Sequence, residues 1–276
     1  ISKNGNIYSL SINLSGTPDG SEELTVSLVA NSAYDAIGNV LSINNSKTIS
    51  LNDQTKPVIG GINFAADNSY ADINFSVPVY ANNNGTGALE LSDFIIEFNQ
   101  SSGTATAASM TSIKKNDSAN EANASSLTGG ESVVRIFISI TGIPNGMEEL
   151  TIKPKNASSI FDLSGNSADN NIASISSKFQ DRLSPTISFS PANNSDQIKL
   201  DSLIIITFSE SVRQLNDAEI TNNNVGSLVS LNRQEPDGPS LDFTATINSN
   251  KKIITIDPAQ DFSFNEKIYV SFNDVE

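Results

Sequence analysis

The chain has 276 residues, a formal net charge of −15, and neither histidine nor cysteine. The acidic balance argues against nucleic-acid and anionic-membrane partners, because binding to phosphate needs clustered Lys and Arg. The absence of His excludes Ser-His-Asp and Cys-His catalysis and His-ligated zinc or iron. The absence of Cys excludes a disulfide framework, while paired carboxylates and hard cations such as Ca²⁺ remain open.

The sequence shows neither a membrane span nor a recognisable signal peptide. No run approaches the ~18 consecutive apolar residues of a membrane span, so we expect no direct membrane insertion. The opening ISKNGN has no initiator Met and none of the features of a signal peptide. We therefore interpret the chain as a window of a longer protein, and expect its targeting signals outside that window.

The first 55 residues contain two segments in which apolar and polar residues alternate. This period of two predicts half-buried antiparallel strands over residues 8–14 and 24–28. The tripeptide PDG at residues 18–20 joins them, with the fixed φ of Pro and the positive φ of Gly that a hairpin turn needs. The apolar positions of the two segments are Tyr8, Leu10, Ile12, Leu14, Leu24, Val26 and Leu28.

Residues 56–184 repeat these elements in the same order. GTPDGSEELTV (16–26) returns as GIPNGMEELTI (142–152), YDAIGN (34–39) as FDLSGN (161–166), and DQTKP (53–57) as DRLSP (181–185). The spacings are 126, 127 and 128 residues, so one module of nearly constant length recurs. Earlier in this module we expect a short helical turn near residues 89–93, a weak strand at 104–108 and a long mobile loop at 114–130.

Residues 185–276 begin a third copy. Its opening ITFSESV (206–212) aligns with INFSVPV (73–79), and Ile268 and Val270 correspond to Leu150 and Ile152. A second short helical turn is expected near residues 215–219. The copy stops before a closing Asp-x-x-Gly-Asn motif, so we predict a module that lacks its last strand.

The repeat divides the chain into three parts. We predict that residues 1–55 are the second half of a module, 56–184 a complete module, and 185–276 a module without its final strand. Pro57 and Pro185 mark the boundaries, since Pro ends a strand and stiffens a short link. Seven or so short strands closing on two sheets describe an all-β fold of tandem immunoglobulin-like antiparallel β-sandwiches.

Two kinds of motif resemble a known family. The openings FSVPV (75–79) and FSESV (208–212), and the closings DAIGN (35–39) and DLSGN (162–166), are typical of bacterial Ig-like repeat domains of large surface and secreted proteins. The first two modules resemble swimming-motility and adhesin-type repeats, and the third resembles a related bacterial Ig-like domain. The resemblance implies beads on a string that hold an adhesive or enzymatic tip away from the cell. It identifies an architecture and not a ligand.

The paired acidic residues Glu22-Glu23 and Glu148-Glu149 invite comparison with the two carboxylates of a glycosidase. Adjacent residues of a strand point to opposite faces, so two neighbouring carboxylates cannot easily face one bond. We therefore interpret both pairs as solvated strand starts, and we assign no catalytic residue.

Four aspartates are the candidate metal ligands: Asp35, Asp53, Asp162 and Asp181. If their carboxylates converge at the junctions between modules, Ca²⁺ would bridge them and stiffen the array. The alternative is mechanical, since Asp accepts the backbone N–H groups of a tight turn and Gly supplies a positive φ. The chain has no EF-hand or nonapeptide ligand spacing. Calcium is the one candidate cofactor.

The combined features predict a non-catalytic structural or adhesive repeat segment of a bacterial extracellular or cell-surface protein, acting as an extended stalk or spacer. Its expected partners are other modules of the same long chain, neighbouring subunits, or a ligand on a host or other surface. One alternative is an accessory module of a secreted enzyme. Another is a subunit of an extracellular filament or surface layer, because an unfinished sheet can recruit strands from a neighbouring chain.

Overall fold

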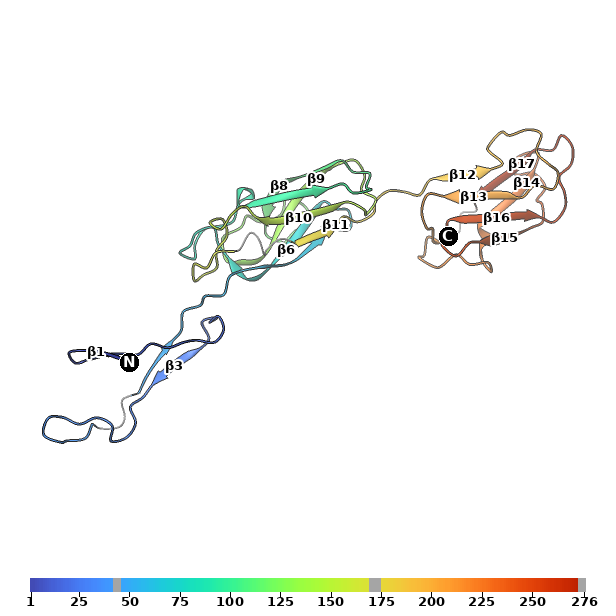
Figure 1. The fold of residues 1–276 in the computed structure, drawn as a ribbon. Coiled ribbons are helices and arrows are strands. Elements are labelled where there is room, and N and C mark those ends of the chain that lie inside the picture. The colour runs from blue at the N-terminus through green and yellow to red at the C-terminus, as the bar shows by residue number, and fades with distance from the viewer. Residues whose placement is uncertain (42–45, 169–174, 273–276) are drawn as a thin grey trace. The chain divides into compact units, whose positions relative to one another are not determined.

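Antiparallel β-sheets make up the fold in this computed structural model, as the alternating sequence predicts (Figure 1). The structure describes residues 1–41, 46–168 and 175–272. It separates into two compact units, Ile1–Leu183 and Ser184–Glu276. Among the described residues, no helix combines the length and the apolar character that crossing a membrane requires.

Residues 56–183 form a sandwich of two sheets. Its strands are β5 (Ile59–Phe64), β6 (Tyr70–Val79), β7 (Phe94–Asn99), β8 (Ala107–Lys114), β9 (Glu131–Thr141), β10 (Glu149–Pro154) and β11 (Ile175–Lys178). The larger sheet has the order β5-β6-β9-β8, and the smaller sheet has the order β11-β10-β7. Every pairing is antiparallel, so the predicted Ig-like antiparallel sandwich is confirmed.

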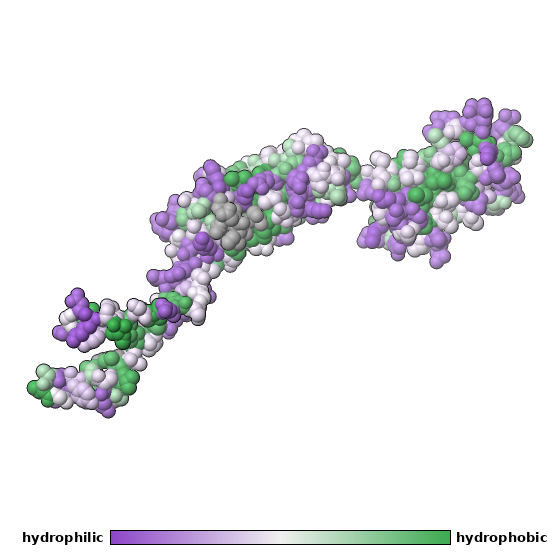
Figure 2. Space-filling view, in the orientation of Figure 1, coloured by the Kyte–Doolittle hydropathy of each residue, from purple (hydrophilic) through white to green (hydrophobic). Residues whose placement is uncertain are grey.

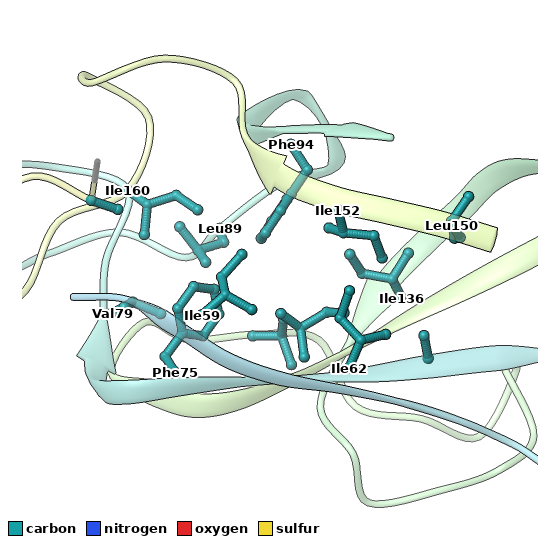
Figure 3. Close-up of a cluster of buried hydrophobic side chains, with 14 of the residues drawn as sticks. Ile59, Ile62, Phe75, Val79, Leu89, Phe94, Ile136, Leu150, Ile152 and Ile160 are labelled. Atoms are coloured by element: carbon teal, nitrogen blue, oxygen red, sulfur yellow. The ribbon is translucent and has the colours of Figure 1, made fainter. Parts of the chain in front are cut away.

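The core of this sandwich follows from the alternation along each strand. In β6, Ala71, Ile73 and Phe75 are buried, while the residues between them face outward. Figure 3 shows Phe94 and Ile152 of the smaller sheet pointing toward the apolar side chains of the larger one. The fully buried apolar residues of this core are Ala71, Ile73, Val134, Ile136, Leu150, Ile152 and Ile160.

The second unit repeats this topology in six of its strands. Its strands are β12 (Ile187–Ser190), β13 (Ile204–Phe208), β14 (Val229–Arg233), β15 (Phe243–Ile247), β16 (Ile253–Pro258) and β17 (Ile268–Phe272). The order β12-β13-β16-β15 corresponds to β5-β6-β9-β8, and the pair β14-β17 corresponds to β7-β10. The described residues of this unit contain no counterpart of β11. A separate apolar cluster, including Ile206, Leu231 and Ile256, fills its interior.

The described part of residues 1–55 contains two short antiparallel pairs, and the strand predicted over residues 8–14 is limited to residues 7–9. β1 (Ser2–Asn4) pairs with β2 (Ile7–Ser9), and β3 (Glu23–Val26) pairs with β4 (Lys47–Ser50). The second pair corresponds to β10 and β11, in agreement with the sequence repeat. Most of its side chains are exposed, since no second sheet covers them.

The expectation for residues 104–130 is confirmed in part, since a strand is present but displaced and residues 115–130 form a connection without a strand. The strand is β8, which starts later, has eight residues and pairs with β9 through a register shift between Met110 and Ser112. The segment after it is tied to the sheet by Arg135, which donates to the carbonyl of Ser118 at 2.7 Å. Arg135 also pairs with Asp72 at 2.7 Å and lies 3.6 Å above the ring of Tyr70. Because β8 consists mostly of small and polar residues, its alternation of apolar and polar side chains is weak in the sequence. The spacing of residues also gives no indication of the long-range contacts of Arg135.

The two predicted helical turns have different outcomes. The first is confirmed by a 3-10 turn, η1 (Leu91–Asp93). The second is wrong, because residues 215–219 form no helix and the turn η2 (Val225–Leu228) lies further along the chain. Leu215, at the start of the second predicted turn, is 93% exposed, whereas Leu89, at the start of the first, is buried. Helical turns this short leave almost no periodic signal.

A pair of equivalent residues tests whether covering by a second sheet supplies the stability. Ile136 is fully buried, while its counterpart Leu10 is 54% exposed. We expect Ile136→Ala to destabilise the sandwich by about 2–5 kcal/mol, and Leu10→Ala to change its stability by less than about 0.5 kcal/mol. Urea denaturation followed by circular dichroism, with hydrogen exchange assigning the transition to residues 56–183, measures both. Equal effects of the two substitutions would contradict this account.

Candidate functional site at the module ends

The closing turn of the complete module is built around Asp162, which is 3% exposed. Its carboxylate accepts the backbone N–H of Asn166 at 2.8 Å and the side-chain amide of Asn166 at 2.9 Å. Gly165 has φ of 85°, a conformation that favours glycine. The same amide of Asn166 also donates to the carbonyl oxygen of Asp53 at 3.2 Å. One asparagine therefore connects the predicted ligands Asp53 and Asp162.

Asp35 forms the equivalent turn in residues 1–55. Its carboxylate accepts the backbone N–H groups of Ile37 at 3.0 Å and Asn39 at 2.8 Å, and the side-chain amide of Asn39 at 2.7 Å. These hydrogen bonds, that of the Asn39 side chain above all, lower the pKa of Asp35 from its usual value. The mechanical role that the sequence offered as an alternative is thus present in both copies of the motif.

Asp53 and Asp181 share a different role. Each accepts the backbone N–H two residues further on, from Thr55 at 2.8 Å and Leu183 at 2.9 Å. Each also lies against the Pro-x-Gly hairpin turn of its own copy, so that a Cβ on Gly20 or on Gly146 would stand 3.2 or 3.3 Å from the aspartate Cβ. This contact fixes the point at which the chain leaves each copy.

Within the complete module, Asp162 and Asp181 lie at opposite ends of the sandwich. Phe161 hydrogen-bonds to Tyr80 beside the start of β9, while Asp181 bridges to Asn145 just after its end. β9 has 11 residues, which correspond to roughly 35 Å of strand. The side chain of Asn166 thus links Asp53 to Asp162. Asp181 lies at the other end of the sandwich. In the described ranges, no group of three or more acidic residues is placed to hold a metal ion.

Glu148 has a structural role, and the interpretation of this residue as a solvated strand start is wrong. It is fully buried and not a solvated strand start. Its carboxylate accepts the backbone N–H of Ala105 at 2.7 Å and of Asn145 at 3.1 Å. Gly103 makes the approach feasible, because a Cβ there would lie 2.2 Å from the Glu148 carboxyl carbon. The neighbouring Glu149, one position along, is partly exposed, as alternation requires.

The electrostatics of Glu148 follow from these contacts. Burial of the carboxylate raises its pKa, but the backbone N–H donors, led by that of Ala105, outweigh burial and lower the pKa below the usual 4.5. Glu22, the repeat counterpart, is exposed and accepts the N–H of Asp19 at 3.1 Å. The glutamate therefore fastens the hairpin turn in both copies, and in the complete module it also fastens the segment before β8.

Comparison with known proteins agrees with this architecture. Residues 181–275 match a family model described as a bacterial Ig-like domain. The match confirms the resemblance to bacterial Ig-like domains and places it in the C-terminal copy. No curated protein and no solved structure matched the chain significantly.

The buried carboxylate predicts a pH dependence of stability. Because the folded-state pKa of Glu148 is lowered, its contribution is fully present above the unfolded-state value of about 4.5 and is lost as the pH falls below it. Glu148→Gln should cost about 1–3 kcal/mol at pH 7 and should flatten the dependence between pH 5 and 3. Urea denaturation across this range measures it, with Glu22→Gln as the exposed control. A Glu148→Gln variant with an unchanged pH profile would count against the assignment.

Calcium binding at the aspartates stays a prediction, and it has a direct test. If Asp53 and Asp162 contribute to a site, Ca²⁺ should raise the melting temperature of the metal-free chain, and Asp162→Asn should abolish the rise. Calorimetry with CaCl₂ or EGTA measures the shift, with Asp181→Asn as a control at the other end of the sandwich. An unchanged melting temperature would leave the four residues as turn formers alone.

Proposed function

We propose that the chain is a non-catalytic spacer segment of a larger bacterial surface or secreted protein, formed by Ig-like modules in tandem. The observation that carries this proposal is the recurrence of one sheet topology, β5-β6-β9-β8 and then β12-β13-β16-β15, in consecutive copies. Repetition of a self-contained unit along a chain adds length without requiring a shared site.

Separate cores support the proposal. The complete module packs around Ile73, Ile136 and Leu150, while the C-terminal unit packs around Ile206 and Ile256. Each core is filled by residues of its own unit, so each unit can fold and bear load independently. The bacterial Ig-like domain at residues 181–275 agrees with a structural role, since such domains occur in bacterial surface proteins.

The acidic side chains resolved in detail also favour a structural role. Glu148 and Asp162 are two buried carboxylates, and each accepts backbone N–H groups from neighbouring loops and turns. Glu97 faces Lys153 in a surface ion pair across β7 and β10. These groups hold loops and strands together. This is the role expected of polar residues in a spacer module.

Mechanical stretching tests the spacer function. Pulling the full chain from its ends should give separate unfolding events for residues 56–183 and for the C-terminal unit, with length gains of roughly 40 nm and 30 nm for about 0.36 nm per residue. Inserting a second copy of residues 57–184 after residue 184 should add one further event of roughly 40 nm and leave the others unchanged. Single-molecule force spectroscopy measures these steps.

Two results would contradict the spacer proposal. One is a single event that unfolds both units together, since this would mean that the copies share a core. The other is loss of the native events after the insertion, because a spacer tolerates a change in the number of its modules. Ile136→Ala serves as the control, as it should weaken only the event of the complete module.

A further inference from the structure

Residues 1–55, the first copy, end in a segment that is tied to the hairpin turn of the same copy. The N–H of Gln54 donates to the carbonyl of Pro18 at 2.8 Å, and the hydroxyl of Thr55 donates to the same carbonyl at 3.2 Å. The carboxylate of Asp53 accepts the N–H of Thr55 at 2.8 Å. This exit segment therefore holds the backbone carbonyl of Asp53 in a defined position.

The closing turn of the complete module is fixed within its own module. Phe161, directly before the turn, exchanges two backbone hydrogen bonds with Tyr80, at 2.7 and 2.9 Å. Gly165 packs so closely against the loop after β6 that a Cβ there would collide with the carbonyl oxygen of Asn83. The turn therefore presents the side-chain amide of Asn166 from a rigid support.

The side-chain amide of Asn166 connects these two parts. Such an amide has two N–H donors, and here it has two acceptors, Asp162 in the same turn at 2.9 Å and the carbonyl of Asp53 at 3.2 Å. Asn39, the counterpart in the first copy, makes the bond within its turn at 2.7 Å. The turn itself thus needs one of the two donors, and at Asn166 the other contacts the exit segment of the preceding copy.

The link between the two parts is short. Val58 already belongs to the complete module, because its N–H donates to the hydroxyl of Ser76 at 3.0 Å and its carbonyl accepts the N–H of Ser76 at 2.9 Å. Pro57 is buried, so Lys56 alone separates this module from Thr55 of the exit segment. Figure 2 shows hydrophilic surface along this link, which favours polar contacts over apolar packing as the means of orienting it.

We propose that the closing turn is a docking site for the preceding module, and that its asparagine limits bending between the two by binding the exit carbonyl. In this chain the docking residue is Asn166 and the occupant is the carbonyl of Asp53. One hydrogen bond is enough because the short link already holds donor and acceptor at a high effective concentration. The coupling requires no metal ion. The inference rests on the spacer function proposed above and adds how such a spacer resists bending.

The exit segment of the complete module is built in the same way. The N–H of Arg182 donates to the carbonyl of Pro144 at 2.8 Å, and the carboxylate of Asp181 accepts the N–H of Leu183 at 2.9 Å. The carbonyl of Asp181 is thus the counterpart of the Asp53 carbonyl. A second complete module attached to this exit segment should therefore repeat the coupling.

The test uses the full chain with a second copy of residues 57–184 inserted after residue 184, so that two complete modules share a junction. The chain has no Cys and Ser139 is exposed, so Ser139→Cys in both copies gives one defined pair of spin labels. Double electron–electron resonance in the presence of EGTA measures the distribution of distances between them. Asn166→Ala in the second copy should widen this distribution by about two-fold or more, since modules without a large interface move relative to each other.

The matched control is Asn166→Ala in the first of the two copies. It removes the same bonds within the turn but leaves the measured junction intact, so the distribution should stay narrow. Equal widths in the two variants overturn the proposal, whether or not they differ from the unsubstituted chain. This failure is distinct from failure of the spacer function, because the number of separate unfolding events tests the spacer and the width of the distance distribution tests the docking.

The native chain provides a second measurement for the case in which the inserted copy does not fold. NMR spectroscopy measures the exchange of the Asn166 side-chain amide protons with water. Inserting Gly-Ser-Gly-Ser between Thr55 and Lys56 lengthens the link without changing either turn, and should speed this exchange by about ten-fold. The side-chain amide of Asn39 is the control and should be unaffected. Unchanged exchange at Asn166 in the lengthened chain overturns the proposal.

Discussion

The structure depends on one constraint, which is that a strand with alternating side chains must have its apolar face covered by a second sheet. In the complete module this cover reduces the exposure of Ile73, Ile136 and Leu150 to zero. Each such side chain contributes about 1.5–3 kcal/mol when it leaves water. In residues 1–55 the same pattern without a second sheet leaves Leu10 half exposed. The contrast arises within one chain, between repeat counterparts that share the same alternation of apolar and polar residues.

Polar groups at the module ends stabilise the turns that the apolar core does not reach. Asp162 and Glu148 take up the backbone N–H groups of turns that would otherwise be buried without partners. Asp53 and Asp181 hold the chain against the hairpin turn of its own copy where it leaves toward the next. These residues recur because the turns of each module contain backbone N–H groups that need hydrogen-bond acceptors. Their recurrence therefore has a physical reason that requires neither catalysis nor a bound metal.

Closed units of one topology follow one another along the chain. A closed sandwich such as residues 56–183 satisfies its inner faces and adds length. The described part of residues 1–55 contains β3 and β4, the counterparts of β10 and β11, with no second sheet packed on them. Repetition of such a closed unit adds length without requiring any special side chain.

Much of this protein could be predicted from its residues alone. The period of two, the recurring hairpin turns and the Asp-x-x-Gly-Asn closings determined the all-β fold and the order of the copies, because these features act over a few neighbouring residues. Tertiary structure alone decided that Glu148 is buried while Glu22 is exposed, that Arg135 fastens the segment after β8, and that Asn166 joins Asp53 to Asp162. Each of these depends on a partner between 17 and 113 residues away, and the spacing of residues within a strand contains no information about what lies across the sandwich.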